Sequence, residues 1–459
     1  MARSILITGA RIVNEGRIFE GDVFVENGVI KKISSPPAPL PVRQAGSPEG
    51  EGVSSWDRID GRGKYLLPGV IDEHVHLREP GLTEKGDIYS ETKAAVAGGV
   101  TSLMDMPNTN PKAISLNILE EKFDLAARKS FANYSFYLGA TNDNISEIEN
   151  ANPSRICGLK VFMGASTGNM LVDNPVSLDR IFERSPLLIA VHTEEESIIR
   201  ENLRIFRGKY GEDIPMEAHP LIRSEEACFT SSEKAVKLAF KHHSRLHLLH
   251  ISTEKELDLL DNSIPLEQKK VTGEVCVNHL WFDDRDYKKS GSLIKWNPAI
   301  KKESDKKGLL RGVLDNRIDT IATDHAPHTL GEKQNPYMTC SSGAPLVQHS
   351  LVAMLELYRR GEISMEKIVE KMCHGPAILY RIKDRGFIRT GYSADLVLVD
   401  LNAPWKVNSS NILYKCGWSP MEGQTFNSRV THTIVNGNIV YENGSFDETA
   451  RGVRLEFKY

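Results

Sequence analysis

Several features that would indicate a particular class of protein are missing from this sequence of 459 residues. Six cysteines are scattered along it without a Cys-x-x-Cys pair, so it shows no disulfide framework. No stretch approaches the run of about 18 apolar residues that a membrane span requires. A net charge of -4 provides no basic surface for nucleic acid. The N-terminus begins directly with strand-like sequence and shows no secretory signal. We expect a cytoplasmic protein with reduced thiols and no membrane or nucleic-acid partner.

Strand-like and helix-like segments alternate through the central part of the chain, a pattern that predicts parallel βα units. Helix-like stretches such as 89–97, 114–129 and 225–242 separate the strands. Eight βα units over roughly 250 residues predict a closed (β/α)₈ barrel of the TIM type, in which active-site residues lie at the C-terminal ends of the strands. The eight expected strands are Val70–His76, Thr101–Met106, Ser135–Ala140, Ile156–Met163, Leu187–His192, Leu246–Ile251, Val271–Val277 and Asp319–Thr323.

Both ends of the chain contain short β-rich runs broken by Asn-Gly turns. Strands from the two ends could build one small β domain, which we expect to be a β-sandwich, around the central barrel. Residues 36–56 are rich in Pro, Gly and Ser, which favours an irregular loop. The predicted organisation is the N-terminal part of the β domain at 1–64, the barrel at 65–385 and the C-terminal part of the β domain at 386–459.

The first expected strand ends in two histidines. An apolar run, Tyr65-Leu66-Leu67 and then Val70-Ile71, leads to His74 and His76 and stops at Pro80-Gly81. Side chains alternate along a strand, so the two imidazoles point the same way and can bind one metal ion. Two structural histidines near a turn are the alternative. Further metal-ligand residues at other strand ends favour the metal site.

A lysine lies inside the fourth apolar run, Gly158-Leu159-Lys160-Val161-Phe162. A buried lysine is costly unless it is paired or neutralised. The simpler interpretation is a lysine at a strand edge that reaches solvent. The functional interpretation is carbamylation of Lys160 by carbon dioxide, which creates an anionic pair of oxygens able to bridge two divalent cations.

Strands five, six and eight also end in residues that bind metals. His192 and His250 end two successive strands, and Asp324 ends the last one. An aspartate can bind a metal ion and still accept a proton from water. A turn-forming aspartate is the alternative. The donor types suit Zn²⁺, although Mn²⁺ or Co²⁺ would also fit. The expected metal ligands are His74, His76, Lys160, His192, His250 and Asp324.

These residues resemble the amidohydrolase superfamily. Within it, His74-Val75-His76-Leu77-Arg78-Glu79-Pro80-Gly81 and Asp324-His325-Ala326-Pro327-His328 look like the dihydroorotases, as do Met106-Pro107-Asn108-Thr109 and Asn297-Pro298. The resemblance spans nearly the whole chain. It implies reversible cyclisation of N-carbamoyl-L-aspartate to L-dihydroorotate in pyrimidine biosynthesis. It further implies two divalent metal ions, carbamylated Lys160, catalytic Asp324 and, as the usual assembly, a homodimer.

Four polar residues follow strands one, two, seven and eight and should surround the barrel mouth. Arg78 can hold a carboxylate through two hydrogen bonds, and Asn108, Asn297 and His328 can add further contacts to the substrate. For Arg78, the alternative is a salt bridge to Glu79 or Glu84. For the two asparagines, the alternative is a turn residue next to proline.

Some segments depart from the dihydroorotase pattern. Val277-Asn278 replaces Pro-His, and Asn297-Pro298-Ala299-Ile300-Lys301 replaces Asn-Pro-Pro-Leu-Arg. We expect altered pocket detail with retained chemistry. Gly168 and Asn169 resemble dihydropyrimidinases and allantoinases, so a related cyclic amidase is the main alternative function. Arg78 separates the two, because dihydropyrimidines have no carboxylate to bind. A scaffold subunit without activity is a third hypothesis, but such a chain should have lost ligands.

Overall fold

The fold was analysed in a computed structural model that describes residues 4–35, 56–164 and 170–459. The expected irregular loop falls outside this described part except for Trp56, and so do Gly168 and Asn169. No helix in the described part is both long and apolar enough to cross a membrane. All six cysteines are free thiols.

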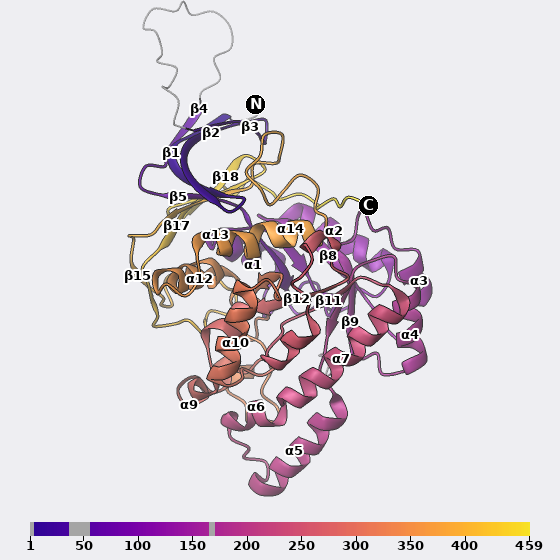
Figure 1. The fold of residues 1–459 in the computed structure, drawn as a ribbon. Helices are drawn as coiled ribbons and strands as arrows, with labels where there is room; N and C mark the ends of the chain where they lie inside the picture. The colour runs from indigo at the N-terminus through magenta and orange to yellow at the C-terminus, as the bar shows by residue number, and fades with distance from the viewer. Residues whose placement is uncertain (1–3, 36–55, 165–169) are drawn as a thin grey trace, which may run out of the picture.

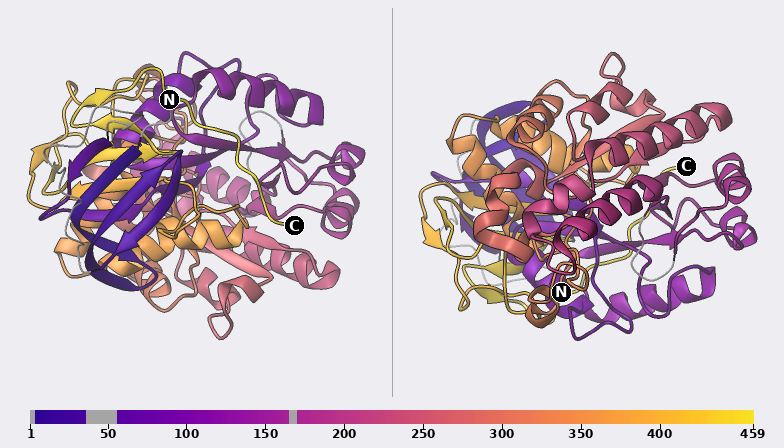
Figure 2. Two further views of the ribbon diagram at one scale, coloured as in Figure 1. Left: turned by 90° about the horizontal axis from the view of Figure 1, so that it is seen from above. Right: turned by 90° about the horizontal axis from the view of Figure 1, so that it is seen from below.

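Eight parallel strands form the barrel, in the order in which they follow along the chain (Figure 2). Each expected strand is present, with bounds that shift by at most three residues. The first and last strands meet through a parallel bridge between Val75 and His325, where the His76 amide donates to the His325 carbonyl over 2.7 Å. The strands are β6 (Val70–Val75), β7 (Val100–Asp105), β8 (Asn133–Gly139), β9 (Gly158–Phe162), β10 (Ile189–His192), β11 (Leu246–Leu248), β12 (Val271–Cys276) and β13 (Thr320–Ala322).

Helices surround the barrel on the outside (Figures 1 and 2). Short polar residues begin several of them: the Ser115 side chain, for example, accepts a hydrogen bond from the Ile118 amide, and such caps stabilise a helix N-terminus. The three expected helices are present as α1, α2 and α7. The α-helices are α1 (Ile88–Ala97), α2 (Leu116–Lys129), α3 (Ile145–Glu149), α4 (Pro175–Arg184), α5 (Glu196–Tyr210), α6 (His219–Ile222), α7 (Glu225–His242), α8 (Val277–Trp281), α9 (Tyr287–Ser290), α10 (Glu303–Leu314), α11 (Leu330–Lys333), α12 (Ser350–Arg359), α13 (Met365–Val369) and α14 (Gly375–Leu379).

Strands from both chain ends join one sheet of nine strands, which curves beside the barrel (Figure 1). Its members pair mostly antiparallel, and β14 from the C-terminal part lies between β5 and β17. The expected composite β domain is therefore present. Its strands are β1 (Ser4–Asn14), β2 (Arg17–Glu26), β3 (Val29–Ser34), β4 (Trp56–Asp60), β5 (Tyr65–Pro68), β14 (Leu396–Asp400), β17 (Arg429–Val435), β18 (Asn438–Glu442) and β19 (Ser445–Phe446); β15 (Trp405–Lys406) and β16 (Thr425–Phe426) form a separate pair.

The apolar run before the first histidines divides between the two sheets. Tyr65–Pro68 pairs with β1 and β14, whereas the barrel begins at Val70. Gly69 lies between them, where an added Cβ would come within 2.0 Å of the Thr101 hydroxyl oxygen. The chain therefore changes sheets at Gly69, and a larger residue would collide with the neighbouring strand. This crossing brings the β domain directly against the start of β6.

Candidate metal and substrate site at the barrel mouth

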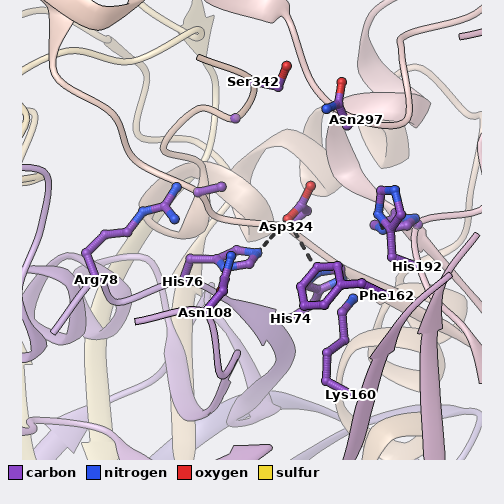
Figure 3. A pocket seen from close by; sticks show the side chains of 13 residues that line it. His74, His76, Arg78, Asn108, Lys160, Phe162, His192, Asn297, Asp324 and Ser342 are labelled. Atoms are coloured by element: carbon purple, nitrogen blue, oxygen red, sulfur yellow. Dashed lines mark hydrogen bonds and ion pairs between the residues drawn. The ribbon is translucent and has the colours of Figure 1, made fainter. Parts of the chain in front are cut away.

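A pocket opens at the C-terminal ends of the barrel strands (Figure 3). All six expected metal ligands line it, and so do three of the four expected substrate residues. His328 is the exception, since it lies behind Arg78. The lining residues are His74, His76, Arg78, Asn108, Lys160, Phe162, His192, His250, Asn297, Asp324, Ala326, Ser342 and Gly343.

His74, His76 and Asp324 form the first cluster of donor atoms. One carboxylate oxygen of Asp324 lies 3.3 Å from His74 Nε2 and 3.2 Å from His76 Nε2. All three residues are buried. Burial opposes ionisation of Asp324, but His74, His76 and Lys160 outweigh it and lower the pKa of that carboxyl. Asp324 therefore stays ionised at neutral pH, in the form that binds a metal or accepts a proton.

His192 and His250 form a second cluster. His192 Nδ1 lies 2.9 Å from His250 Nε2. Burial lowers the pKa of both imidazoles. Neutral imidazole is the form that coordinates a metal, and His250 has a positive φ of 40°. The two nitrogens are thus placed as a pair of ligands for one ion.

Lys160 lies on the pocket floor between these clusters (Figure 3). Its side chain is 1% exposed, and in the described residues its amine has no ion pair or hydrogen bond. The nearest feature is the Phe162 ring, whose centroid is 4.7 Å from Nζ. Burial lowers the pKa of Lys160 to about 7, so a substantial fraction is the neutral amine that can react with carbon dioxide. The alternative interpretation, a lysine at a strand edge that reaches solvent, is wrong.

Two acceptors orient the first pair of imidazoles. Glu274 accepts a hydrogen bond from His74 Nδ1 over 2.7 Å, and the Asn108 side-chain oxygen accepts one from His76 Nδ1 over 2.8 Å. Both histidines therefore direct Nε2 toward Asp324. Acceptors of this kind fix the tautomer and ring orientation of a metal-binding histidine. The strand-end pattern did not indicate Glu274, although a glutamate inside the apolar strand β12 is a visible signal in the sequence.

Glu194 orients His192 in the same way. Its carboxylate lies 3.0 Å from His192 Nε2 and pairs with the Arg223 guanidinium. Burial opposes ionisation of Glu194, yet Arg223 and His192 lower its pKa to about 2. The carboxylate thus accepts a hydrogen bond from the protonated Nε2 of His192. The other ring nitrogen, Nδ1, is then unprotonated and faces His250. The strand-end pattern did not indicate this role either, although Glu194 follows His192 by two residues.

The donor set fits two divalent cations. Imidazole nitrogens and carboxylate oxygens converge within 4.8 Å in the group His74, His76 and Asp324, and borderline donors of these types suit Zn²⁺. The second pair, His192 and His250, faces the same pocket. Deeper groups around Glu274, one with His74 and Cys276 and one with Glu73 and His247, also bring donors together. Apart from His74, these donors do not line the pocket, and Glu274 already accepts a hydrogen bond from His74.

Arg78 is buried in the pocket wall without an anionic partner. It is 4% exposed, and no carboxylate of the described residues lies within ion-pair distance of its guanidinium. Its Nε donates to the Pro327 carbonyl over 2.9 Å. The alternative of a surface salt bridge is wrong, since Glu79 pairs with Lys129 instead. Burying a cation without an anionic partner is costly, so this guanidinium is suited to bind an anionic ligand.

His328 supports Arg78 from behind. Arg78 Nη2 donates to His328 Nε2 over 3.1 Å. Burial and the neighbouring Arg78 lower the pKa of His328 to about 3, so the imidazole is neutral. Glu332 lies on its other side and pairs with Lys85 over 2.6 Å. Glu332 thus contacts His328, and His328 in turn holds the Arg78 guanidinium at the pocket edge.

Asn297 lies on the opposite wall, whereas the residues that depart from the dihydroorotase pattern do not line the pocket. The side-chain oxygen of Asn297 is buried without a hydrogen-bond partner in the described residues, and it lines the pocket. It is therefore available to a ligand. Asn278 is fully buried but does not line the pocket, and Lys301 donates to the Ala299 carbonyl over 3.2 Å.

The comparisons with known proteins agree with this geometry. The model of the amidohydrolase family matches residues 65–440. A curated dihydroorotase from Pyrococcus abyssi is 33% identical over 98% of each chain, and one from Thermococcus kodakarensis is 31% identical over 98% of each chain. The structure of an L-hydantoinase (dihydropyrimidinase) from Arthrobacter aurescens superposes with a TM-score of 0.88 at 26% identity, covering 97% of this chain and 98% of that one. The chain belongs to the amidohydrolase family.

Proposed function

We propose that this chain is a dihydroorotase, which interconverts N-carbamoyl-L-aspartate and L-dihydroorotate in pyrimidine biosynthesis. The observation that carries the proposal is the buried, unpaired guanidinium of Arg78 beside a cluster of metal ligands. Dihydroorotate has a carboxylate outside its reacting amide, and a guanidinium binds such a group through two parallel hydrogen bonds. Curated relatives named dihydroorotase support the same substrate.

The proposed site holds two Zn²⁺ ions, with Lys160 carbamylated and the histidines and Asp324 as the other ligands. Bound divalent ions would lower the pKa of water toward neutrality and polarise the ring amide carbonyl. The amine of Lys160 supports carbamylation, because it is buried and has neither ion pair nor hydrogen bond in the described residues. A carbamate there would balance the cationic charge of two metals.

Asp324 is the proposed general base and acid. Its carboxylate is ionised and lies at the centre of the ligand cluster, so it can accept a proton from the attacking water. It then delivers that proton to the ring nitrogen as the C–N bond breaks. Arg78 holds the substrate carboxylate, and Asn297 is placed to bind the ring amide. Hydrolysis releases a carboxylate and a proton, so acid favours ring closure and base favours opening.

A dihydropyrimidinase is the second candidate, favoured by the structural likeness to the Arthrobacter aurescens hydantoinase. Both reactions open a cyclic amide, and both would use the same metal cluster. The difference lies at Arg78. A dihydropyrimidine would leave this buried cation without an anion, which costs free energy in the complex. The dihydroorotase function removes that cost.

Turnover of dihydroorotate, dihydrouracil, hydantoin and allantoin by the zinc-loaded protein, measured side by side, tests the proposal. We expect dihydroorotate to give the highest kcat/KM by a wide margin. Preference for dihydrouracil or hydantoin would assign the chain to the second candidate. The homodimer and the cytoplasmic location stay predictions, which size-exclusion chromatography with light scattering and cell fractionation can test.

A further inference from the structure

A second buried lysine lies next to the pocket, at the end of the short helix α11. Lys333 is fully buried. Its amine donates to the carbonyls of Lys295 over 3.2 Å, Ser341 over 2.9 Å and Gly343 over 2.8 Å. Three acceptors match the three N–H donors of an ammonium group. Burial lowers the pKa of Lys333 to about 7, and the three carbonyls favour the charged form that can serve all of them.

Two of these carbonyls, those of Ser341 and Gly343, belong to a turn, Ser341–Gly343, that forms one wall of the pocket. Ser342 and Gly343 line it, and Ser342 lies near Asn297 on the side away from Lys160 (Figure 3). The Gly343 amide donates to the Lys295 carbonyl over 2.8 Å. A Cβ at Gly343, where φ is 125°, would come within 2.7 Å of the Ala326 carbonyl oxygen. The turn is therefore packed tightly against the loop after β13.

The turn presents polar groups to the pocket. In the described part of the chain, neither the backbone nor the hydroxyl of Ser342 makes a hydrogen bond, while both of its neighbours do. The same short helix also serves the opposite wall, because Glu332 contacts His328 behind Arg78. Two adjacent side chains of α11, Glu332 and Lys333, thus contact residues of two different walls of the pocket.

We propose that Lys333 is a positioning residue for substrate binding: its ammonium fixes the Ser341–Gly343 turn so that Ser342 faces the substrate. The identity of the substrate rests on the proposed function, whereas the role of Lys333 in placing the turn does not. A buried ammonium is costly without strong acceptors. Its three bonds to backbone carbonyls offset that cost only while the turn keeps this conformation.

Lys333→Met tests the proposal, with Lys295→Met as the matched control. Lys295 is also buried, and its amine donates to the carbonyls of Tyr337 and Cys340, each over 2.7 Å. Those carbonyls belong to the same loop but do not line the pocket. Both variants lose a buried ammonium, so we expect similar drops in Tm. Only Lys333→Met should displace the pocket wall.

Three measurements separate positioning from general destabilisation. A displacement of a substrate-positioning group by about 1 Å can lower kcat/KM by up to about 100-fold. We therefore expect Lys333→Met to raise KM for dihydroorotate about 10- to 100-fold, with kcat much less affected. Hydrogen exchange should accelerate in the peptide containing Ser341–Gly343, and metal content should match the wild type. Lys295→Met should keep a KM close to the wild type.

An unchanged KM, unchanged exchange in that peptide, or equal KM increases in both variants would each overturn the proposal. If Lys333→Met fails to fold, Lys333→Gln, which keeps two N–H donors, is judged by the same criteria with a smaller expected rise in KM. Absence of dihydroorotate turnover by the wild-type enzyme contradicts the proposed function instead. The exchange measurement still decides the role of Lys333 in that case.

Discussion

Arg78→Met removes the one buried guanidinium that lines the pocket while keeping an apolar side chain of similar length. Apart from substrate, two contacts are lost: the bond to the Pro327 carbonyl and the bond to His328 Nε2. No carboxylate of the described residues is left unpaired, because none pairs with Arg78. The variant should therefore fold and keep its metal ligands, and its defect should concern the substrate.

The size of the defect follows from the bonds that the substrate loses. A hydrogen bond to a charged group is worth about 1.5–3 kcal/mol, and each 1.36 kcal/mol is about tenfold in rate. Loss of one such bond therefore lowers kcat/KM for dihydroorotate by roughly 10- to 150-fold. Dihydrouracil has no carboxylate, so its kcat/KM should change far less. The ratio of the two values is the quantity that matters.

A spectrophotometric assay on both substrates, with metal content measured in parallel, gives this ratio. Lys85→Met is the matched control: it removes a cation from the same wall, but that cation is already paired with Glu332 over 2.6 Å. We expect the control to leave the ratio of the two substrates unchanged. Equal losses on dihydroorotate and dihydrouracil in Arg78→Met would show that Arg78 supports the metal site only, and the dihydropyrimidinase function would then be favoured.

Further predictions concern the metal cluster. Lys160→Ala should lose most activity and bound metal, with partial rescue by short carboxylic acids; an unmodified ammonium at Lys160 in an active, fully metallated crystal structure would contradict the carbamate. Asp324→Asn should lower kcat by about 10²–10⁴-fold or more, and wild-type turnover at full metal occupancy would assign the base to another residue. Glu194→Gln should weaken metal binding by about 10- to 100-fold, measured by competition with a chelator, because a neutral amide replaces the carboxylate that fixes the His192 tautomer; unchanged affinity would refute that role. Chelation of the metals should abolish activity and lower Tm, since ligand binding stabilises the native state.

The barrel could be predicted from the sequence because its strands are buried on both faces. β6, β7, β8, β9 and β12 are buried along their whole length, and parallel strands of this kind give continuous apolar runs. The same property concealed where Tyr65–Pro68 belongs. An apolar run does not identify the sheet it joins, and only the pairing of β5 with β1 and β14 and of β6 with β7 separates the two strands.

The candidate ligands could be found because one rule of the fold places them at strand ends. The residues that orient them follow no such rule. Glu274 meets His74 from a strand 200 positions away, and Glu194 depends on Arg223 from the loop before α7. Lys333 was missed for a further reason: its partners are backbone carbonyls, which every residue has and which no sequence pattern marks.

Lys160 and Arg78 are buried and have no anionic partners in the described residues. This difference from ordinary buried cations suggests an order of events, in which the metal cluster forms first and the substrate binds second. Burying an unpaired charge costs several kcal/mol unless the group is neutralised. Lys160 has a pKa lowered to about 7, so it can lose its proton and react with carbon dioxide before substrate arrives. Arginine cannot be deprotonated in a protein, and no carboxylate of the described residues pairs with Arg78. We therefore expect the metal cluster to form independently of the substrate, and the Arg78 subsite to be completed by the carboxylate of the proposed substrate.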